Sequence, residues 1–254
     1  MAASTWSTTD KSASLTLTGS NLIATAASSS QSVRGKDPKR TGKYYLEYTS
    51  TTTQSGSSTF GFASARAPLG TVTSVASSIG PSASAGAIVA YDVFGATVSF
   101  GLGVGAVTTG TLVCAAINLD AGTIWFRVGA AGNWNNNAAN TPATGVGGLS
   151  LSTIGLGQGI DCYPFVVLGA SPNSITANFG ATAFTGAVPA GFTSGWDDSV
   201  SIVTNVVATQ AFVEQWGSGT PELWVTQVLL EQWASVADAP PVVPSVDTRV
   251  MVLA

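Results

Sequence analysis

Apolar and polar residues alternate with a period of two along most of the chain between Leu15 and Phe192. Because successive side chains of a β-strand point to opposite faces, this alternation predicts half-buried strands. Gly, Pro, Ser and Asn separate the runs, and no convincing amphipathic helix precedes residue 198. The expected strands are 15–18, 22–25, 43–49, 60–63, 87–91, 97–100, 112–119 and 123–128. The pattern predicts an all-β, antiparallel two-sheet sandwich.

The clearest predicted hairpin joins residues 112–119 to 123–128 through Asp120-Ala121-Gly122. A three-residue connection that ends in glycine suits a type I turn followed by a bulge, because glycine accepts a positive φ without Cβ strain. Asp120 at the start of this turn is interpreted as a local cap rather than as a catalytic acid.

Composition removes several classes of function. The 254 residues include no histidine and only 9% charged residues, so catalytic triads and His-ligated zinc sites are excluded. The net charge of −4 provides no global field for nucleic acid or an anionic membrane. No apolar run is long enough to span a bilayer, and the amino terminus lacks a basic segment followed by an apolar one. We expect no nucleic-acid partner, no membrane partner and synthesis in the cytoplasm.

The sequence offers no catalytic, metal or cofactor motif. Cys114 and Cys162 are not in a CxxC arrangement, so they indicate either two free thiols or a disulfide rather than a metal site. None of the four glutamates has an acidic neighbour at strand spacing, as a glycosidase would need. The glycine run at residues 101–105 lacks the helix and lysine of a phosphate loop. The expectation is a protein that is not an enzyme.

Basic residues cluster at one position in the chain, with five of the nine between residues 34 and 43. Gly35, Pro38 and Gly42 place this cluster in a connection between strands, where charge usually only solvates the loop. Two functional alternatives are a nucleic-acid site and contact with a protein partner, and the second is the more compatible with the loop position. Arg34, Lys36 and Lys39 are the candidate partner-binding residues.

A second candidate surface is the asparagine-rich loop at residues 133–140. Asparagine amides and a tryptophan ring suit hydrogen bonding and stacking with sugars or protein edges. The alternative is that Trp134 folds back and covers the sandwich. Asn133, Trp134 and Asn135 are therefore candidate partner-binding residues.

An ordered set of short motifs resembles a SPRY domain of the bacterial and phage type, from about residue 5 to residue 196. The motifs are Thr5-Trp-Ser, Asp10-Lys-Ser, Ser32-Val-Arg-Gly35, Gly42-Lys-Tyr-Tyr-Leu-Glu-Tyr48, Phe60-Gly-Phe62, Asn118-Leu-Asp-Ala-Gly-Thr-Ile-Trp-Phe126, Tyr163-Pro-Phe-Val166 and Asn178-Phe-Gly180. The resemblance implies a concanavalin-like sandwich over residues 1–198 that binds proteins through variable loops and has no catalytic activity.

After residue 198 the composition changes, and an internal repeat appears in residues 199–238. Residues 209–218 and 226–235 share Thr, Gln, Glu, Gln, Trp and Ser at matching positions. Phe212 and Trp216 fall on one face in strand phase, and Leu229 and Trp233 take the same places in the second copy; a helical reading stays open. Residues 239–254 read as a proline-rich spacer and a terminal strand. Short repeats need neighbours to bury their aromatic faces, so these four residues are candidate anchors.

The repeat is similar to segments attached to tailed-phage structural proteins. It favours the hypothesis of a virion component, either a head decoration or a tail fibre, which binds other virion proteins through its tail. A host-surface protein or glycan is a possible further partner, and self-association is compatible with this role. The alternatives are a soluble bacterial protein-binding module and a carbohydrate-binding receptor module.

Overall fold

The computed structural model describes residues 2–54, 58–69, 76–83, 86–157 and 159–197. Fifteen strands and three short 3₁₀ helices make up these residues. The strands are β1 (Trp6–Lys11), β2 (Leu15–Thr18), β3 (Ile23–Ala26), β4 (Gln31–Gly35), β5 (Lys43–Ser50), β6 (Thr59–Ser64), β7 (Ser78–Pro81), β8 (Ala87–Tyr91), β9 (Thr97–Gly103), β10 (Leu112–Asn118), β11 (Thr123–Val128), β12 (Leu149–Ser150), β13 (Cys162–Leu168), β14 (Ser174–Asn178) and β15 (Thr193–Ser194). The helices are η1 (Trp134–Asn136), η2 (Pro142–Thr144) and η3 (Ser152–Ile154).

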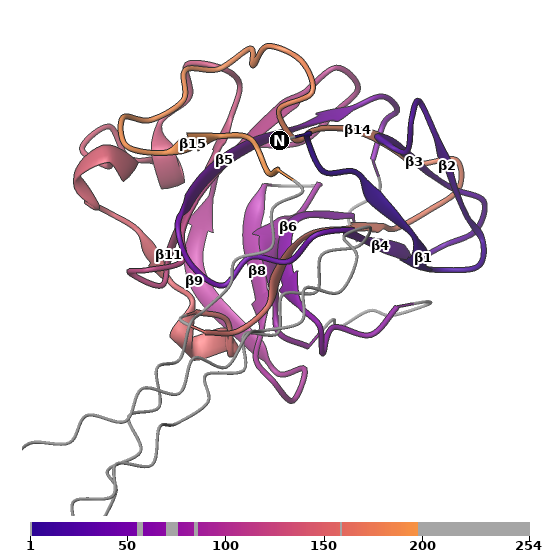
Figure 1. Ribbon diagram of the computed structural model, residues 1–254, viewed down its shortest axis with the longest axis horizontal. Helices are drawn as coiled ribbons and strands as arrows, with labels where there is room; N and C mark the ends of the chain where they lie inside the picture. The colour runs from indigo at the N-terminus through magenta and orange to yellow at the C-terminus, as the bar shows by residue number, and fades with distance from the viewer. Residues whose placement is uncertain (1, 55–57, 70–75, 84–85, 158, 198–254) are drawn as a thin grey trace, which may run out of the picture. The chain divides into compact units, whose positions relative to one another are not determined.

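The strands form two sheets, which Figure 1 shows as two layers. The first sheet has the order β1-β4-β13-β6-β7-β8-β9. The second has the order β12-β11-β10-β5-β14-β3-β2, and β15 pairs with β5. Every pair is antiparallel except β15 with β5, which is parallel. The predicted all-β antiparallel sandwich is confirmed.

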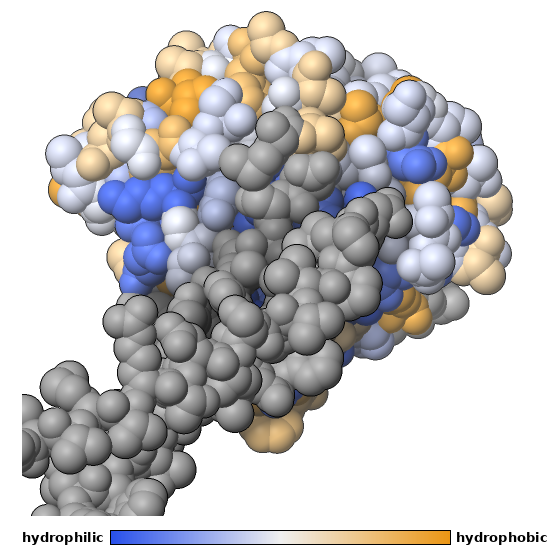
Figure 2. All heavy atoms as spheres, viewed as in Figure 1, coloured by the Kyte–Doolittle hydropathy of each residue, from blue (hydrophilic) through white to orange (hydrophobic). Residues whose placement is uncertain are grey.

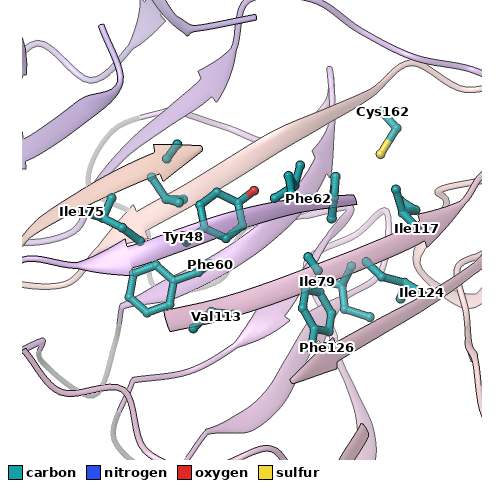
Figure 3. Packing of buried hydrophobic residues seen from close by; sticks show 14 of the residues in the cluster. Tyr48, Phe60, Phe62, Ile79, Val113, Ile117, Ile124, Phe126, Cys162 and Ile175 are labelled. Carbon is teal, nitrogen blue, oxygen red and sulfur yellow. The ribbon is translucent and has the colours of Figure 1, made fainter. Parts of the chain in front are cut away.

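The main core lies between the two sheets. On β5, Leu46 and Tyr48 point into this core and are fully buried. The Tyr48 hydroxyl donates a hydrogen bond of 2.6 Å to the carbonyl oxygen of Gly61 on the opposite sheet, so the buried phenol keeps a partner. Figure 3 shows side chains of both sheets meeting in this layer, among them Phe60, Phe62, Val113, Ile117 and Phe126.

A second apolar layer covers the outer face of the second sheet. Tyr45, Cys114 and Trp125 point away from the main core, and they pack with Trp134 and Phe192 from the connecting segments. Both faces of β10 are therefore buried, which explains why residues 112–117 are almost uniformly apolar rather than alternating. On the face drawn in Figure 2, hydrophobic residues form separate patches among weakly hydrophilic ones.

The predicted hairpin of β10 and β11 is confirmed, with Asn118 paired to Thr123 and Gly122 at φ 62°. The Asp120 carboxylate, predicted to cap its own turn, accepts a hydrogen bond of 2.8 Å from the Gly42 N–H outside the turn. Asn118 accepts the Ala121 N–H within the turn. The aspartate thus joins this turn to the loop before β5.

Replacing Gly122 with alanine is expected to lower the free energy of unfolding by about 1 kcal/mol, because an L residue is strained in the left-handed region. A Cβ at this position meets no atom within 4 Å, so the cost is conformational only. Urea denaturation measures the change. Gly122→Asn serves as the control and is expected to lose less, because asparagine tolerates this conformation better; an equal loss in both variants would contradict the explanation.

The described sandwich ends at Trp196 and Asp197. Trp196 is fully buried in the core, and its backbone oxygen accepts the N–H of Ser4. Asp197 pairs with Ala3 in an isolated antiparallel bridge. The predicted segments 199–238 and 239–254, with the candidate anchors Phe212, Trp216, Leu229 and Trp233, lie outside the described residues. Within the part of the chain that the structure describes, no helix is long and apolar enough to cross a membrane.

Candidate binding site

Several connections between strands meet at one end of the sandwich, here called the loop end. They are residues 36–42, 92–96, 119–122 and 151–161 without 158. Three contacts join three of these connections: Lys39 and Cys162 exchange two backbone hydrogen bonds of 2.9 Å, Arg40 forms an ion pair with Asp161, and Gly42 donates to Asp120. The loops therefore support one another and form a continuous surface.

A cleft of about 500 Å³ opens in the loop end. Its lining mixes apolar side chains, serine hydroxyls and exposed backbone, with one charged group. The lining residues are Arg66, Val93, Ala121, Gly122, Ser150, Ser152, Gly155, Leu156, Gly157 and Ile160. Arg66 is exposed and forms no ion pair with any described residue. A single cation in a mixed lining suits a ligand that is partly apolar and carries a negative group.

Exposed apolar side chains lie beside this cleft. In the described ranges, the exposed large hydrophobic residues are Phe94, Val146 and Ile160, with exposures of 91%, 48% and 44%. Ile160 lines the cleft, and Phe94 follows the lining residue Val93. Phe94 and Ile160 therefore both lie at the loop end, next to the cleft.

The turn that carries Phe94 is held rigidly by Asp92. The Asp92 Oδ1 atom accepts hydrogen bonds from the N–H groups of Phe94 (2.8 Å) and Ala96 (2.9 Å). The Asp92 N–H also bonds to the Ala96 oxygen, and Gly95 adopts a φ of 81° that completes the turn. Phe94 is thus presented to solvent on an ordered turn, so its burial by a partner would cost little backbone entropy.

The candidate residue Arg34 is buried on the outer face of the first sheet, because its neighbour Val33 points into the core and its paired residue Phe165 belongs to a separate apolar cluster. Its guanidinium forms two hydrogen bonds with the Asp10 carboxylate, of 2.6 and 2.8 Å, and two more with the carbonyl oxygens of Ser64 and Ala65. It also stands 5.6 Å from the centre of the Tyr163 ring. These contacts satisfy the buried charge and join β1, β4 and β6, so Arg34 acts within the chain in this structure.

Lys39 and Lys36 occupy different environments. Lys39 is fully buried, and its ammonium forms an ion pair with Asp197 and lies 5.6 Å from the centre of the Tyr44 ring. The Lys36 side chain is 63% exposed, with its nitrogen 4.0 Å from Asp37. Of the three basic candidates, Lys36 is accessible to a partner.

Two side chains of the asparagine-rich loop, Trp134 and Asn135, are buried, whereas residues 136–139 are exposed. Trp134 is buried under the guanidinium of Arg127, which lies 4.3 Å from the ring centre. Asn135, 1% exposed and at φ 46°, accepts the Phe126 N–H and donates to the Gly147 carbonyl. The partner-binding candidates Trp134 and Asn135 are thus buried in this structure, which agrees with the alternative that Trp134 folds back onto the sandwich, and Asn133 is the exposed member of this candidate set.

Beneath residues 182–192, here called the strap, lies a buried polar cluster that the sequence analysis did not predict. Glu47 is 3% exposed, and its carboxylate accepts hydrogen bonds from the Tyr45 hydroxyl (2.7 Å) and from the N–H groups of Thr185 (3.1 Å) and Gly186 (2.7 Å). Arg127 donates to the Ala187 oxygen at 3.0 Å. The only sign in the sequence was a glutamate among the aromatic residues of β5.

Close packing at Gly186 keeps solvent out of this cluster. A Cβ at this position would lie 2.5 Å from the Tyr45 hydroxyl and 2.9 Å from an Arg127 nitrogen. The Glu47 carboxylate accepts its hydrogen bonds from Tyr45, Thr185 and Gly186. The arrangement fastens the strap to the sheet, and it leaves Glu47 shielded from a substrate.

Both cysteines are free and buried. Burial raises the pKa of the Cys114 and Cys162 thiols and that of the Tyr48 phenol. The described residues contain no group of three potential metal-ligating side chains from His, Cys, Asp and Glu. The alternative of a disulfide between the two cysteines is not realised in this structure.

These raised pKa values predict a loss of stability in alkali. The two thiols are neutral in the folded state, and unfolding allows them to ionise once the pH exceeds the ordinary cysteine pKa of about 8.5, whereas the Tyr48 phenol contributes only above about pH 10. Stability is therefore fully present below about pH 8 and falls as the pH rises, by at most about 1.4 kcal/mol per pH unit for each group. Urea denaturation between pH 7 and pH 10 measures the slope, which Cys162→Ala should reduce. A slope unchanged in that variant would contradict the assignment.

The fold and its loop end define a class of protein: an all-β, antiparallel two-sheet sandwich with a surface cleft between its connecting loops. No protein-family model matches the chain, and no curated protein sequence matches it.

Solved structures that are similar to this chain include the SPRY domain of human HERC1, with 11% identity, a TM-score of 0.43 and coverage of 68% of this chain and 96% of that one. The TRIM65 PSpry domain is similar with 13% identity, a TM-score of 0.46 and coverage of 69% and 89%. Stonustoxin is similar with 17% identity, a TM-score of 0.39 and coverage of 69% of this chain and 27% of that one.

Proposed function

We propose that this chain is a non-enzymatic binding component of a phage virion, which contacts a protein partner through the loop end and is attached by its C-terminal repeats. The observation that carries the binding role is the cleft of about 500 Å³ beside Phe94, an aromatic side chain that is 91% exposed on a hydrogen-bonded turn. Exposed aromatic side chains and arginines are enriched in protein contact surfaces, and Arg66 in this cleft forms no ion pair with any residue that the structure describes.

The environment of Glu47 supports a role without catalysis. A general acid or base must reach its substrate directly or through one water molecule. Glu47 is buried under the strap and bonded to Tyr45, Thr185 and Gly186. Its geometry suits a fastening of the fold better than proton transfer.

The position of Trp134 weighs against a carbohydrate-binding module. Sugar rings stack on an accessible aromatic face, and the Arg127 guanidinium covers one face of Trp134. Protein contact at the loop end is therefore the better supported mode of binding.

The virion setting is supported by the repeat in residues 209–218 and 226–235 and by the resemblance of the sandwich motifs to phage SPRY domains. Head decoration and tail fibre are both compatible with this setting. A chain segment that attaches the sandwich would start at Asp197, which Lys39 holds at the loop end.

The attachment is tested by the double variant Trp216→Ala/Trp233→Ala in phage particles purified by density gradient. We expect the double variant to accumulate in the lysate as the wild type does and to be lost from the particles. Trp224→Ala is the matched control, because this tryptophan lies between the two repeat copies. Equal incorporation of the double variant and the wild type would contradict attachment through the repeats.

A further inference from the structure

We infer that the partner of the loop end is a second copy of this chain, which docks by reciprocal insertion of Phe94 into the cleft of the other copy. The inference rests on the proposed function only in taking the loop end as the contact surface. It adds which molecule fills the cleft, namely a second copy of this chain.

The projection and the cavity are neighbours in the chain. Val93 lines the cleft, whereas Phe94 points into solvent at the next position. A surface that carries both features side by side can complement itself across a two-fold axis, since placing one Phe94 in the opposite cleft brings the other Phe94 to the first cleft. Such an isologous contact closes at two copies.

The cleft suits an aromatic side chain. Its volume of about 500 Å³ is within the range of sites that enclose small ligands, which leaves room for one phenyl ring. Leu156 and Ile160 provide apolar contacts on its wall, and Ile160 is itself 44% exposed. Insertion would therefore bury apolar surface from both copies.

Charges on the same surface are also complementary. Arg66 lines the cleft and has no ion pair among the described residues, while Asp92 lies at the base of the turn that carries Phe94. The Asp92 Oδ1 atom accepts both side-chain hydrogen bonds of the turn, and no described residue donates a hydrogen bond to Oδ2. Reciprocal docking brings Arg66 of each copy towards Asp92 of the other, and the contact should weaken as salt rises.

The pairing is expected to be weak in isolation, because two phenylalanine insertions bury less surface than a standard stable interface. On a particle with many copies, linked weak contacts gain strength through their high local concentration. This contact would therefore act between neighbouring copies on the virion.

Sedimentation velocity of the full chain, from about 1 to about 100 µM, tests the inference. We expect a concentration-dependent dimer in the wild type, and a Kd at least about tenfold higher in Phe94→Ser. Ser152→Trp fills the cleft from its exposed wall and should raise the Kd at least as much. Val146→Ser removes an exposed apolar residue that does not line the cleft, and it should leave the dimer unchanged.

A mixture of the two disrupting variants tests directly whether Phe94 of one copy enters the cleft of the other. Phe94→Ser keeps its cleft and Ser152→Trp keeps its Phe94, so mixing them restores one of the two insertions. We expect hetero-association in the mixture at concentrations where each variant alone is monomeric. A wild type that stays monomeric at about 100 µM, or a dimer that Phe94→Ser does not weaken, would overturn the inference. Protein that is monomeric but still incorporated into particles would leave the proposed function standing.

Discussion

Trp196→Ala lowers the free energy of unfolding by about 3–5 kcal/mol, as expected for the loss of a fully buried tryptophan. The ring packs 4.9 Å from the centre of Tyr44 and 5.6 Å from that of Phe62, so it contacts both sheets. Its indole N–H donates to the Asp37 carbonyl at 2.6 Å. Urea denaturation followed by far-UV circular dichroism measures the change.

A Trp196→Phe variant separates the packing contribution from the hydrogen bond. It retains most of the ring and loses the indole N–H, so its loss should be clearly smaller than that of the alanine variant. A loss below about 1 kcal/mol in Trp196→Ala would contradict the placement of residue 196 in the core. The sandwich would then end before residue 196 in the sequence.

Glu47→Ala is expected to be similarly damaging, with a loss of about 3–5 kcal/mol. The substitution removes the acceptor of three hydrogen bonds, and each buried donor left without a partner costs about 1–3 kcal/mol. The strap should then detach before the rest of the sheet unfolds. Faster hydrogen exchange at the Gly186 amide and faster reaction of Cys114 with a thiol reagent would report this detachment.

Glu47→Gln is the matched control for this prediction. Glutamine has the same size and keeps one acceptor oxygen, but its NH₂ group faces an N–H donor of the strap. We therefore expect a loss between those of the wild type and the alanine variant. Unchanged exchange at Gly186 in Glu47→Ala would contradict the role of Glu47 in holding the strap.

The sequence predicted best the elements in which side-chain alternation and turn residues indicate the same structure. Strands β2 and β8 have the predicted bounds, and the β10–β11 hairpin has its predicted glycine at positive φ. In these elements local conformation and side-chain alternation favour the same structure, so the local sequence was sufficient to predict the strand bounds and the turn.

Alternation was a poorer guide where both faces of a strand are buried. All five residues of β4 and all four of β7 are buried, so their sequences QSVRG and SIGP show no contrast between an inner and an outer face. Close approach of the backbones at Gly61 and Gly80 also replaces side-chain packing there. Such strands depend on tertiary contacts that a local pattern does not contain.

The candidate site was predictable only in part, for a related reason. A cluster of basic residues indicates charge in a loop, but it does not reveal that Asp10 and Asp197 pair with Arg34 and Lys39 across the fold. Phe94 lies between the predicted strands 87–91 and 97–100, and nothing in the local sequence singles it out. Its exposure becomes evident once Val93 and the Asp92 turn are placed beside the cleft.

Immunogold electron microscopy of purified phage particles tests the central claim most directly, with an antibody raised against residues 1–198. The proposed function predicts regular labelling at a fixed position on the particle, and that position distinguishes a head decoration from a tail fibre. Particles without label, with the protein detected only in the soluble lysate, would contradict the virion role and favour a soluble protein-binding module.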